Sequence, residues 1–483
     1  MVNYLYDSLT SFRTVFSRDK TWLIFVMIVL GFIGSTEMVG VSSFCRFWLL
    51  EIPGYHTLNH FFRSSAWTLN ELLNHWFFFV SSSGLCMTSQ GRVVTLGDHT
   101  VLSRDGRKMP GVVTLHQDSD TQSKPGYFRG QCWGALAAVI GVAPHMFALP
   151  LILQMHQGYQ HLGKENNDKA PTMGERMVDM ALSFALKTNQ PSLLVLDAFF
   201  STQTVFNRAK TIYSLTLQRP LVEIIVRAKK NYVAYFQADP KDYKGSGCYA
   251  KYGEKVHLME IFDHQSCFAT VEARIYNNIE TIKLYHLDLL WQPLRTTLRF
   301  VFAETSHGRI VLMCSNLSQD PLAAIELYCI RVRIETMFDM LKNVIHAFQC
   351  HFWSKGMPKH SRKPRKNSEL IVPKPQKLQA IQRCWDATEG FVNIGAITLG
   401  LLQLIATRFS TEIWHQYEGF LKTRSREIPS ERTTKNVLAG LLVRDFLNVA
   451  PSAIMRKIRS TILKGKIEDK IFRDSNVWAR KAA

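Results

Sequence analysis

The segment 320–345 carries apolar and charged residues at the spacing of an α-helix with two different faces. At about 100° per residue, its apolar side chains gather on one side, where they can pack against a core. The opposite side, a sector about 60° wide, presents a phenol, two cations and a carboxylate. These four residues are Tyr328, Arg331, Glu335 and Lys342. Asp320 and Pro321 provide an N-cap and a proline at the first helical position, so we expect the helix to begin there.

The first 90 residues carry the patterns of packed helices. Residues 22–34 form the most apolar run of the chain, and residues 55–80 repeat apolar positions at helical spacing. The first run is shorter than the roughly 18 to 20 residues that span a bilayer, so we interpret it as a buried helix, with a membrane anchor as the alternative. Arg and His side chains in 46–63 allow a DNA-binding role for a helical domain over 1–90, although packing alone explains the same pattern.

At residue 91 the pattern changes to that of strands. Three strand-like segments come first, and helix and strand then alternate. The expected strands span 91–100, 112–116, 131–141, 191–197 and 221–227, and the expected helices span 175–187 and 202–215. The last two strands are continuous apolar runs, which are typical of strands buried on both faces. The pattern therefore predicts an α/β core over residues 91–227.

The rest of the chain divides into four further parts. Six strand-like segments within 228–319 predict a β-rich insertion, which separates the core strands from the helix in 320–350. Residues 351–377 hold eight Lys or Arg, one Glu and four prolines, a composition that predicts a basic linker. Helical spacing of apolar residues returns in 378–483, which predicts a helical C-terminal domain.

The overall composition adds a partner class to this picture. With 46% hydrophobic and 20% charged residues, the 483-residue chain has a globular composition. Its formal net charge of +19 implies a polyanionic partner. Nucleic acid is the commonest such partner, and a membrane surface is the rival.

Cysteine and histidine spacing gives little support for a zinc site or a disulfide framework. The nine cysteines are scattered, and no C-x-x-C pair occurs. His346, Cys350 and His351 lie close together, but no second pair of ligands follows at zinc-finger spacing. We interpret the cysteines as buried thiols of a reducing cytoplasm.

The spacing Tyr328-x2-Arg331-x3-Glu335-x6-Lys342 resembles the YREK signature of insertion-sequence DDE transposases. The resemblance implies a ribonuclease H-like catalytic core, interrupted by a β-rich insertion and flanked by helical N- and C-terminal domains. It further implies that Glu335 is the third metal-binding carboxylate, and that Tyr328, Arg331 and Lys342 hold DNA near the cut. Members of this family place a β insertion between the second aspartate and the glutamate helix, which is where 228–319 lies.

Metal-dependent cleavage of a phosphodiester needs carboxylates at strand ends and on a helix that faces them, because Mg²⁺ and Mn²⁺ prefer hard oxygen ligands. Asp98 ends the first core strand and Asp197 ends the strand 191–197, and both match the family's first and second aspartates. The resemblance thus implies that Asp98, Asp197 and Glu335 are catalytic and bind two Mg²⁺ or Mn²⁺ ions. Alternatively, Asp98 is a turn residue and Asp197 a helix N-cap. Asp339, on the same helix face, is the alternative to Glu335.

These expectations together describe a DDE transposase that cleaves DNA at transposon ends and transfers the 3′-hydroxyl strand into target DNA. The resemblance implies double-stranded DNA as the partner, a homodimer on DNA, and a prokaryotic, cytoplasmic and nucleoid-associated protein without a membrane partner. Two alternatives stay open: a non-catalytic DNA-binding protein derived from a transposase, and a membrane-associated basic protein. His99 and Thr100 are expected to position a phosphate or a water. Trp291 is a candidate for stacking a flipped base, with a buried core role as its alternative.

Overall fold

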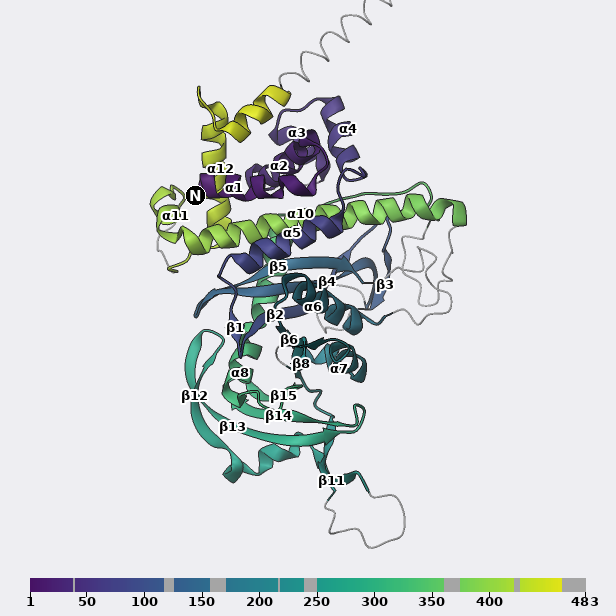
Figure 1. Ribbon diagram of the computed structural model, residues 1–483, viewed down its shortest axis with the longest axis vertical. Helices are drawn as coiled ribbons and strands as arrows, with labels where there is room; N and C mark the ends of the chain where they lie inside the picture. Colours follow the sequence, from purple (N-terminus) through teal and green to yellow (C-terminus); the bar gives the residue numbers. More distant parts are fainter. Residues whose placement is uncertain are drawn as a thin grey trace, which may run out of the picture.

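The molecule, a computed structural model, is an elongated α/β protein with one large mixed sheet and helices at both ends of the chain. The expected fold class is therefore confirmed at this level. Figure 1 shows the terminal helices gathered at one end of the molecule and residues 228–319 at the other. The structure describes residues 1–37, 40–116, 126–156, 171–215, 218–238, 250–359, 374–420 and 426–462.

Helices from the two ends of the sequence pack together on one side of the sheet (Figure 1). They are α1 (Val2–Ser11), α2 (Asp19–Gly34), α3 (Val41–Phe47), α4 (Ile52–Phe61), α5 (Leu69–Ser82), α10 (Leu378–Arg408), α11 (Ser410–Gln416) and α12 (Glu431–Leu447). The apolar run 22–34 lies within α2, whose side chains are buried against α10 and α12, as expected for a buried helix.

One described helix, over Pro375–Arg408, is long and apolar enough to cross a membrane. Within the protein, however, 94% of its most apolar window is buried. Its apolar side chains contact β5 (His145–Met155), α2 and α12. The helix therefore has the surroundings of a core helix.

Five strands form the centre of the sheet, in the spatial order β5, β4 (Tyr127–Val142), β2 (Arg92–Ser103), β6 (Ser192–Leu196) and β9 (Val222–Arg227). β2, β4 and β5 are antiparallel neighbours, whereas β2, β6 and β9 run parallel. Every residue of β6 is buried, which explains its continuous apolar run. The short strands β1 (Thr88–Ser89) and β3 (Val113–His116) pair with β2 and β4.

Strand β5 is a central-sheet strand that the sequence pattern did not reveal. It contains Pro150, and proline normally argues against a strand because it lacks a ladder N–H group. Here Pro150 lies opposite Ala137, where the β4–β5 register shifts by an irregularity. In the described part of the chain, β5 pairs with β4 on one edge, so the missing donor is tolerated.

Two helices connect the parallel strands. α6 (Met173–Thr188) begins at a capping box in which Thr172 and Glu175 satisfy each other's backbone N–H groups, and it precedes β6. α7 (Gln203–Ala209) precedes β9 and is shorter than the helix expected over 202–215. The remaining residues of that range form a turn and β7 (Tyr213–Ser214), which pairs with β8 (Arg219–Pro220).

The insertion after β9 extends the same sheet. Its strands are β10 (Val233–Gln237), β11 (Tyr252–His257), β12 (Ala269–Ile275), β13 (Asn278–Trp291), β14 (Thr296–Thr305) and β15 (Gly308–Cys314). β15 pairs with β9, so thirteen of the described strands belong to one sheet. The chain then returns through α8 (Pro321–Ile330) and α9 (Val332–Asn343), which lie against the core strands.

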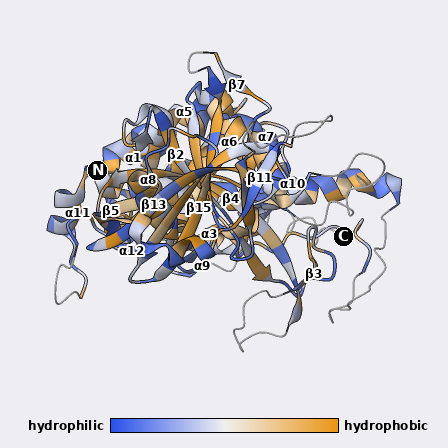
Figure 2. Ribbon diagram, turned by 90° about the horizontal axis from the view of Figure 1, so that it is seen from below, coloured by the Kyte–Doolittle hydropathy of each residue, from blue (hydrophilic) through white to orange (hydrophobic). Residues whose placement is uncertain are grey.

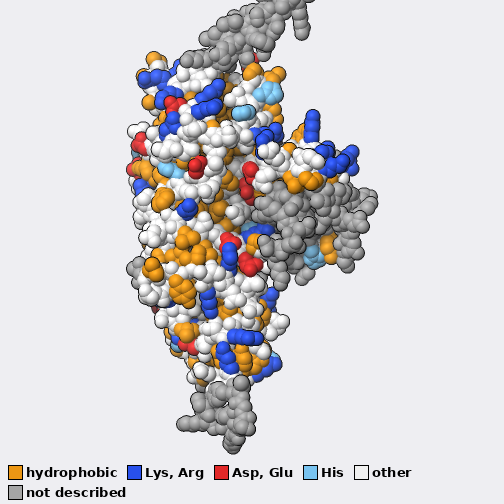
Figure 3. All heavy atoms as spheres, turned by 45° about the vertical axis from the view of Figure 1, so that its right-hand side comes forward, with side chains coloured by type: hydrophobic (Ala, Val, Ile, Leu, Met, Phe, Trp, Pro, Cys, Tyr) orange, Lys and Arg blue, Asp and Glu red, His pale blue; other side chains and the backbone are white. Residues whose placement is uncertain are grey.

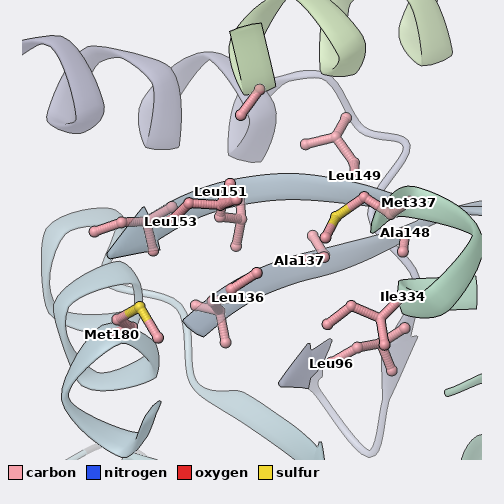
Figure 4. Close-up of a cluster of buried hydrophobic side chains, with 14 of the residues drawn as sticks. Leu96, Leu136, Ala137, Ala148, Leu149, Leu151, Leu153, Met180, Ile334 and Met337 are labelled. Carbon is pink, nitrogen blue, oxygen red and sulfur yellow. The ribbon is translucent and has the colours of Figure 1, made fainter. Parts of the chain in front are cut away.

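Alternation along β2 determines which side chains meet α9, because neighbouring residues of a strand face opposite sides. Gly97 faces α6 so closely that a Cβ atom there would lie 2.7 Å from side-chain atoms of α6 and β6. Leu96 therefore faces the α9 side, from which Ile334 enters the same buried cluster (Figure 4). Asp98 and Thr100 share the face of Leu96, so they also point toward α9.

The hydrophobic residues concentrate in the strands and in the helices that cover them, whereas polar residues dominate the periphery (Figure 2). Trp291 belongs to this interior. It is 3% exposed and packs between the rings of Phe206 and Tyr232, at centroid distances of 5.8 and 5.7 Å. Trp291 therefore has the buried core role, and its ring is not exposed for stacking on a base.

Several predicted segments fall outside the described residues. They are residues 360–373 of the expected basic linker and residues 463–483 of the expected helical C-terminal domain. Within the expected helical C-terminal domain, residues 453–462 form a further helix. Of the eight described cysteines, six are buried as expected, whereas Cys86 is half-buried and Cys267 is exposed.

Candidate functional site

Asp98 and Asp197 lie on adjacent parallel strands at the same level of the sheet. The register pairs Gly97 with Leu196, so the next residue on each strand lies beside the other, about 5 Å away across the sheet. Each carboxylate accepts a hydrogen bond from the backbone N–H of the following residue, at 2.7 Å for Asp98 and 2.6 Å for Asp197. The two predicted aspartates are therefore together, at the carboxyl end of a parallel strand pair.

The helix that faces them begins as expected, with the Asp320 carboxylate accepting a hydrogen bond from the Ala323 N–H at 2.7 Å. The expected continuous helix is, however, divided at Arg331 into α8 and α9. There the Arg331 N–H donates to the Tyr328 carbonyl and the Ile334 N–H donates to the Arg331 carbonyl, which are i to i+3 bonds. Arg331 thus lies in a tight turn between α8 and α9.

Arg331 joins the sheet to the helix. Its Nη1 donates to Asp98 Oδ2 at 3.0 Å, and its Nη2 donates to Glu335 Oε1 at 2.9 Å. Because both nitrogens belong to one planar guanidinium group, the two oxygens lie no more than about 8 Å apart. All three predicted carboxylates therefore gather at one place, two from neighbouring strands and one from the facing helix. Asp197 follows the end of β6 as expected, whereas the expectation that Asp98 ends its strand is wrong, because β2 continues to Ser103 through its pairing with β4.

The other two residues of the signature lie at the same place. Lys342 Nζ donates to Thr100 Oγ1 at 2.6 Å, two residues along β2 from Asp98. The Tyr328 ring is buried, and the Arg331 guanidinium carbon lies 5.9 Å from its centroid. The four residues of the signature and the two aspartates thus form one continuous cluster.

Burial and neighbouring charges set the electrostatics of the cluster. Burial raises the pKa of Asp98 above its ordinary value, although the Arg331 charge and the His99 N–H oppose the shift. Burial by itself lowers the pKa of Arg331, but the neighbouring acidic groups, Asp98 foremost, outweigh it and raise that pKa. Burial also raises the pKa of Tyr328, so its hydroxyl is protonated at neutral pH. The site therefore pairs three carboxylates with cations, of which the Arg331 guanidinium is the one bound to two of the acids.

The alternatives to the three acids have different surroundings. Asp339 is exposed on α9 and accepts a hydrogen bond from Asn343 at 2.6 Å. Asp197 does accept the N–H at the start of a short 3₁₀ helix, Ala198–Phe200, so it caps that turn as well as lying beside Asp98. Asp98 lies within β2, not in a turn.

Two neighbours of the cluster had no clear signal in the sequence. Phe199 is 42% exposed, two residues after Asp197, and its ring centroid lies 4.9 Å from that of His99. Arg227 contacts the Tyr328 hydroxyl from the end of β9. The position of Arg227 at the end of a predicted buried strand was the available indication, whereas that of Phe199 depends on how the turn after β6 folds.

The donor set fits Mg²⁺ or Mn²⁺, since it consists of carboxylate oxygens and leaves room for substrate and water oxygens. Glu335 is 56% exposed on its side chain, so it can reorient toward a metal ion. Among the described residues, no three metal-binding side chains already meet at the spacing of a bound ion, including His346, Cys350 and His351. At the acidic cluster, Arg331 lies between Asp98 and Glu335.

The fold thus brings together two aspartates from adjacent strands, a helix glutamate and three potential phosphate-binding side chains. Comparison of the sequence with protein-family models and with curated proteins finds no match to either.

Proposed function

We propose that this chain is a DDE transposase that uses divalent metal ions to cleave DNA at transposon ends and to join the 3′-hydroxyl end to target DNA. The observation that carries the proposal is the register of β2 and β6, which aligns Asp98 with Asp197 opposite Glu335. Charged residues often lie near one another on a protein surface without any catalytic role. Three acids from distant parts of the chain at one sheet edge, beside the YREK spacing, are much more specific.

The order of the central strands supports a ribonuclease H-like core for this proposal. Three antiparallel strands are followed in the chain by two strands that run parallel to the first, with helices between them. The insertion leaves after β9 and returns to α8, which is where the resemblance expects it. This strand order is the one expected of a ribonuclease H-like core, and it is therefore consistent with the proposed cleavage and transfer of DNA strands.

Each residue of the cluster then has a role that suits its surroundings. Asp98, Asp197 and Glu335 would hold Mg²⁺ or Mn²⁺, which when bound activates the attacking oxygen and stabilises the leaving oxygen. Lys342 provides a point charge for a phosphate, and Arg331 provides a planar fork that can bind two phosphate oxygens. The protonated Tyr328 hydroxyl is a neutral donor held in place by burial.

The charge of the whole chain agrees with a DNA substrate. The net charge is +19, and Figure 3 shows Lys and Arg side chains spread over the visible face. Such a surface neutralises phosphates without reading sequence, and leaves sequence recognition to other contacts. Cleavage at two ends would be coordinated by a homodimer on DNA in a prokaryotic cytoplasm, as the resemblance implies.

The test is a cleavage assay with the purified full-length protein, Mn²⁺ and DNA that includes the sequences flanking its own coding region. The wild type is expected to produce nicks with 3′-hydroxyl ends. Asp197→Asn and Glu335→Gln are expected to lose at least roughly a thousandfold in rate, because a metal ion supplies several kcal/mol of transition-state stabilisation. Asp339→Asn, on the same helix, serves as the matched control and is expected to stay within about twofold.

The outcome separates the proposal from its main alternative. Equal nicking by the wild type and Asp197→Asn would show that the activity does not come from this site. DNA binding by all variants without any nicking would favour a non-catalytic DNA-binding protein derived from a transposase.

A further inference from the structure

Arg331 occupies an unusual position for a residue that is expected to bind DNA. Its two terminal nitrogens bind two of the three acids at 3.0 and 2.9 Å, and its side chain is 13% exposed. Asp98 comes from the sheet and Glu335 from the helix, so the guanidinium is the link that holds these two acids near each other. The two bonds use one N–H of each terminal nitrogen and hold the guanidinium against the acids, so a phosphate that bound it there would lie beside two carboxylates and be repelled by them.

The backbone fixes where this link starts but leaves Glu335 free to move. Arg331 lies in the tight turn between α8 and α9, and the i to i+3 bonds on both sides of it hold its backbone. Glu335 lies one helical turn further on and is half exposed. The bridge can therefore open by rotation of two side chains, without any change in the fold.

Metal ions and this bridge need the same oxygens. Divalent ions bound by Asp98 and Glu335 would lie in the region that the guanidinium occupies, and two positive groups so close together repel each other. The acids cannot all satisfy Arg331 and a pair of metal ions at once. Loading of the site therefore displaces the guanidinium, which is then available to a phosphate.

We propose that Arg331 neutralises the acidic site in the metal-free protein, an inference that rests on the proposed function. Arg331 holds Asp98 and Glu335 together in the metal-free protein, competes with divalent cations for them, and moves to the DNA backbone when metal binds. Metal binding then favours phosphate binding, because it releases Arg331 from the acids. Phosphate binding favours metal binding in turn, because it draws Arg331 away from the oxygens that the metal ions need.

A lysine could not perform this role equally well. The guanidinium presents separate N–H groups to two carboxylates in a fixed plane, whereas an ammonium group is a single point charge. Arg331→Lys therefore keeps the charge of the site but loses the two-acid bridge. This difference separates competition by the bridge from a general effect of positive charge.

The experiment measures binding of Mn²⁺ alone, without DNA, from the spin-resonance signal of free Mn²⁺ during titration of the full-length protein. Arg331→Gln is expected to bind Mn²⁺ roughly tenfold more tightly than the wild type, because charge-assisted hydrogen bonds of about that strength no longer compete. Arg331→Lys is also expected to bind more tightly than the wild type. Arg333→Gln removes an equal charge from α9, where Arg333 binds Asn277 and the Pro144 carbonyl, and is expected to leave the affinity unchanged.

Asp197→Asn identifies the binding that belongs to this site, because it removes a ligand without touching the bridge. If the wild type shows Asp197-dependent Mn²⁺ binding and neither Arg331 variant tightens it, the competition is refuted and the proposed function stands. If Arg331→Gln tightens binding but Arg331→Lys matches the wild type, charge alone acts and the bridge is refuted. If no variant binds Mn²⁺ through Asp197, the proposed function fails as well. Circular dichroism of each variant checks that it is folded.

Discussion

The residues of the candidate site show how far fixed spacing can predict proximity. Tyr328, Arg331, Glu335 and Lys342 share one helical sector, and they remain on one side of the chain although the helix is divided at Arg331. The sequence could also indicate Asp98 and Asp197, because each lies in or directly after a recognisable strand. It could not indicate the bond from Arg331 to Asp98, since residues 233 positions apart are brought together by packing alone.

The raised pKa of Asp98 predicts that ionisation of this one carboxyl group destabilises the folded protein relative to its protonated form. Burial favours the protonated carboxyl in the folded state, so the folded protein binds this proton at a higher pH than the unfolded chain does. Stability is therefore lost as pH rises through the range between the two pKa values. We expect Asp98→Asn, which mimics the neutral form, to raise the thermal midpoint at pH 7.

Thermal unfolding of the wild type and Asp98→Asn across pH 4 to 7 checks this prediction. The advantage of the variant is expected to shrink as pH falls through the raised pKa of Asp98, where the wild-type carboxyl becomes neutral too. A variant that is less stable than the wild type at pH 7 would contradict the prediction, because the Arg331 bond would then outweigh burial.

At the level of whole elements, helix starts were predicted better than helix continuity. The Asp320 cap and Pro321 define the start of α8 as expected, and α6 begins at Met173, two residues before the expected start at 175. The division at Arg331 was not predictable, because the local sequence has no proline or glycine there and the turn tightens within a packed setting. Strand β5 was missed for the opposite reason, since Pro150 is a local signal against a strand.

The cap at Asp320 gives a prediction for this element. Asp320→Ala leaves the Ala323 N–H without its acceptor, so we expect the free energy of unfolding to fall by about 1 kcal/mol. Asp339→Ala is the matched control, since its partner Asn343 is exposed, and a change within about 0.5 kcal/mol is expected. Denaturant unfolding measures both. Equal losses for the two variants would show that the cap is not what stabilises the start of α8.

Across the whole molecule, the sequence indicated the order of parts but not how they join. Alternation of strands and helices predicted an α/β core followed by a β-rich region, and both are present. That β15 would pair with β9 and continue the core sheet could not be predicted, because pairing between distant strands leaves no local pattern. The next core strand after Asp197, β9, pairs with β15 of the insertion, so backbone hydrogen bonds join the insertion to the sheet that carries the site.

The most direct measurement is anomalous diffraction at the manganese edge from crystals of the full-length protein grown with Mn²⁺. We predict two peaks about 4 Å apart, within coordination distance of the carboxylates of Asp98, Asp197 and Glu335, with the Arg331 side chain displaced from Asp98. Crystals that contain Mn²⁺ elsewhere, with no peak between these three carboxylates and Arg331 still bound to Asp98, would contradict the proposed metal-dependent DNA cleavage.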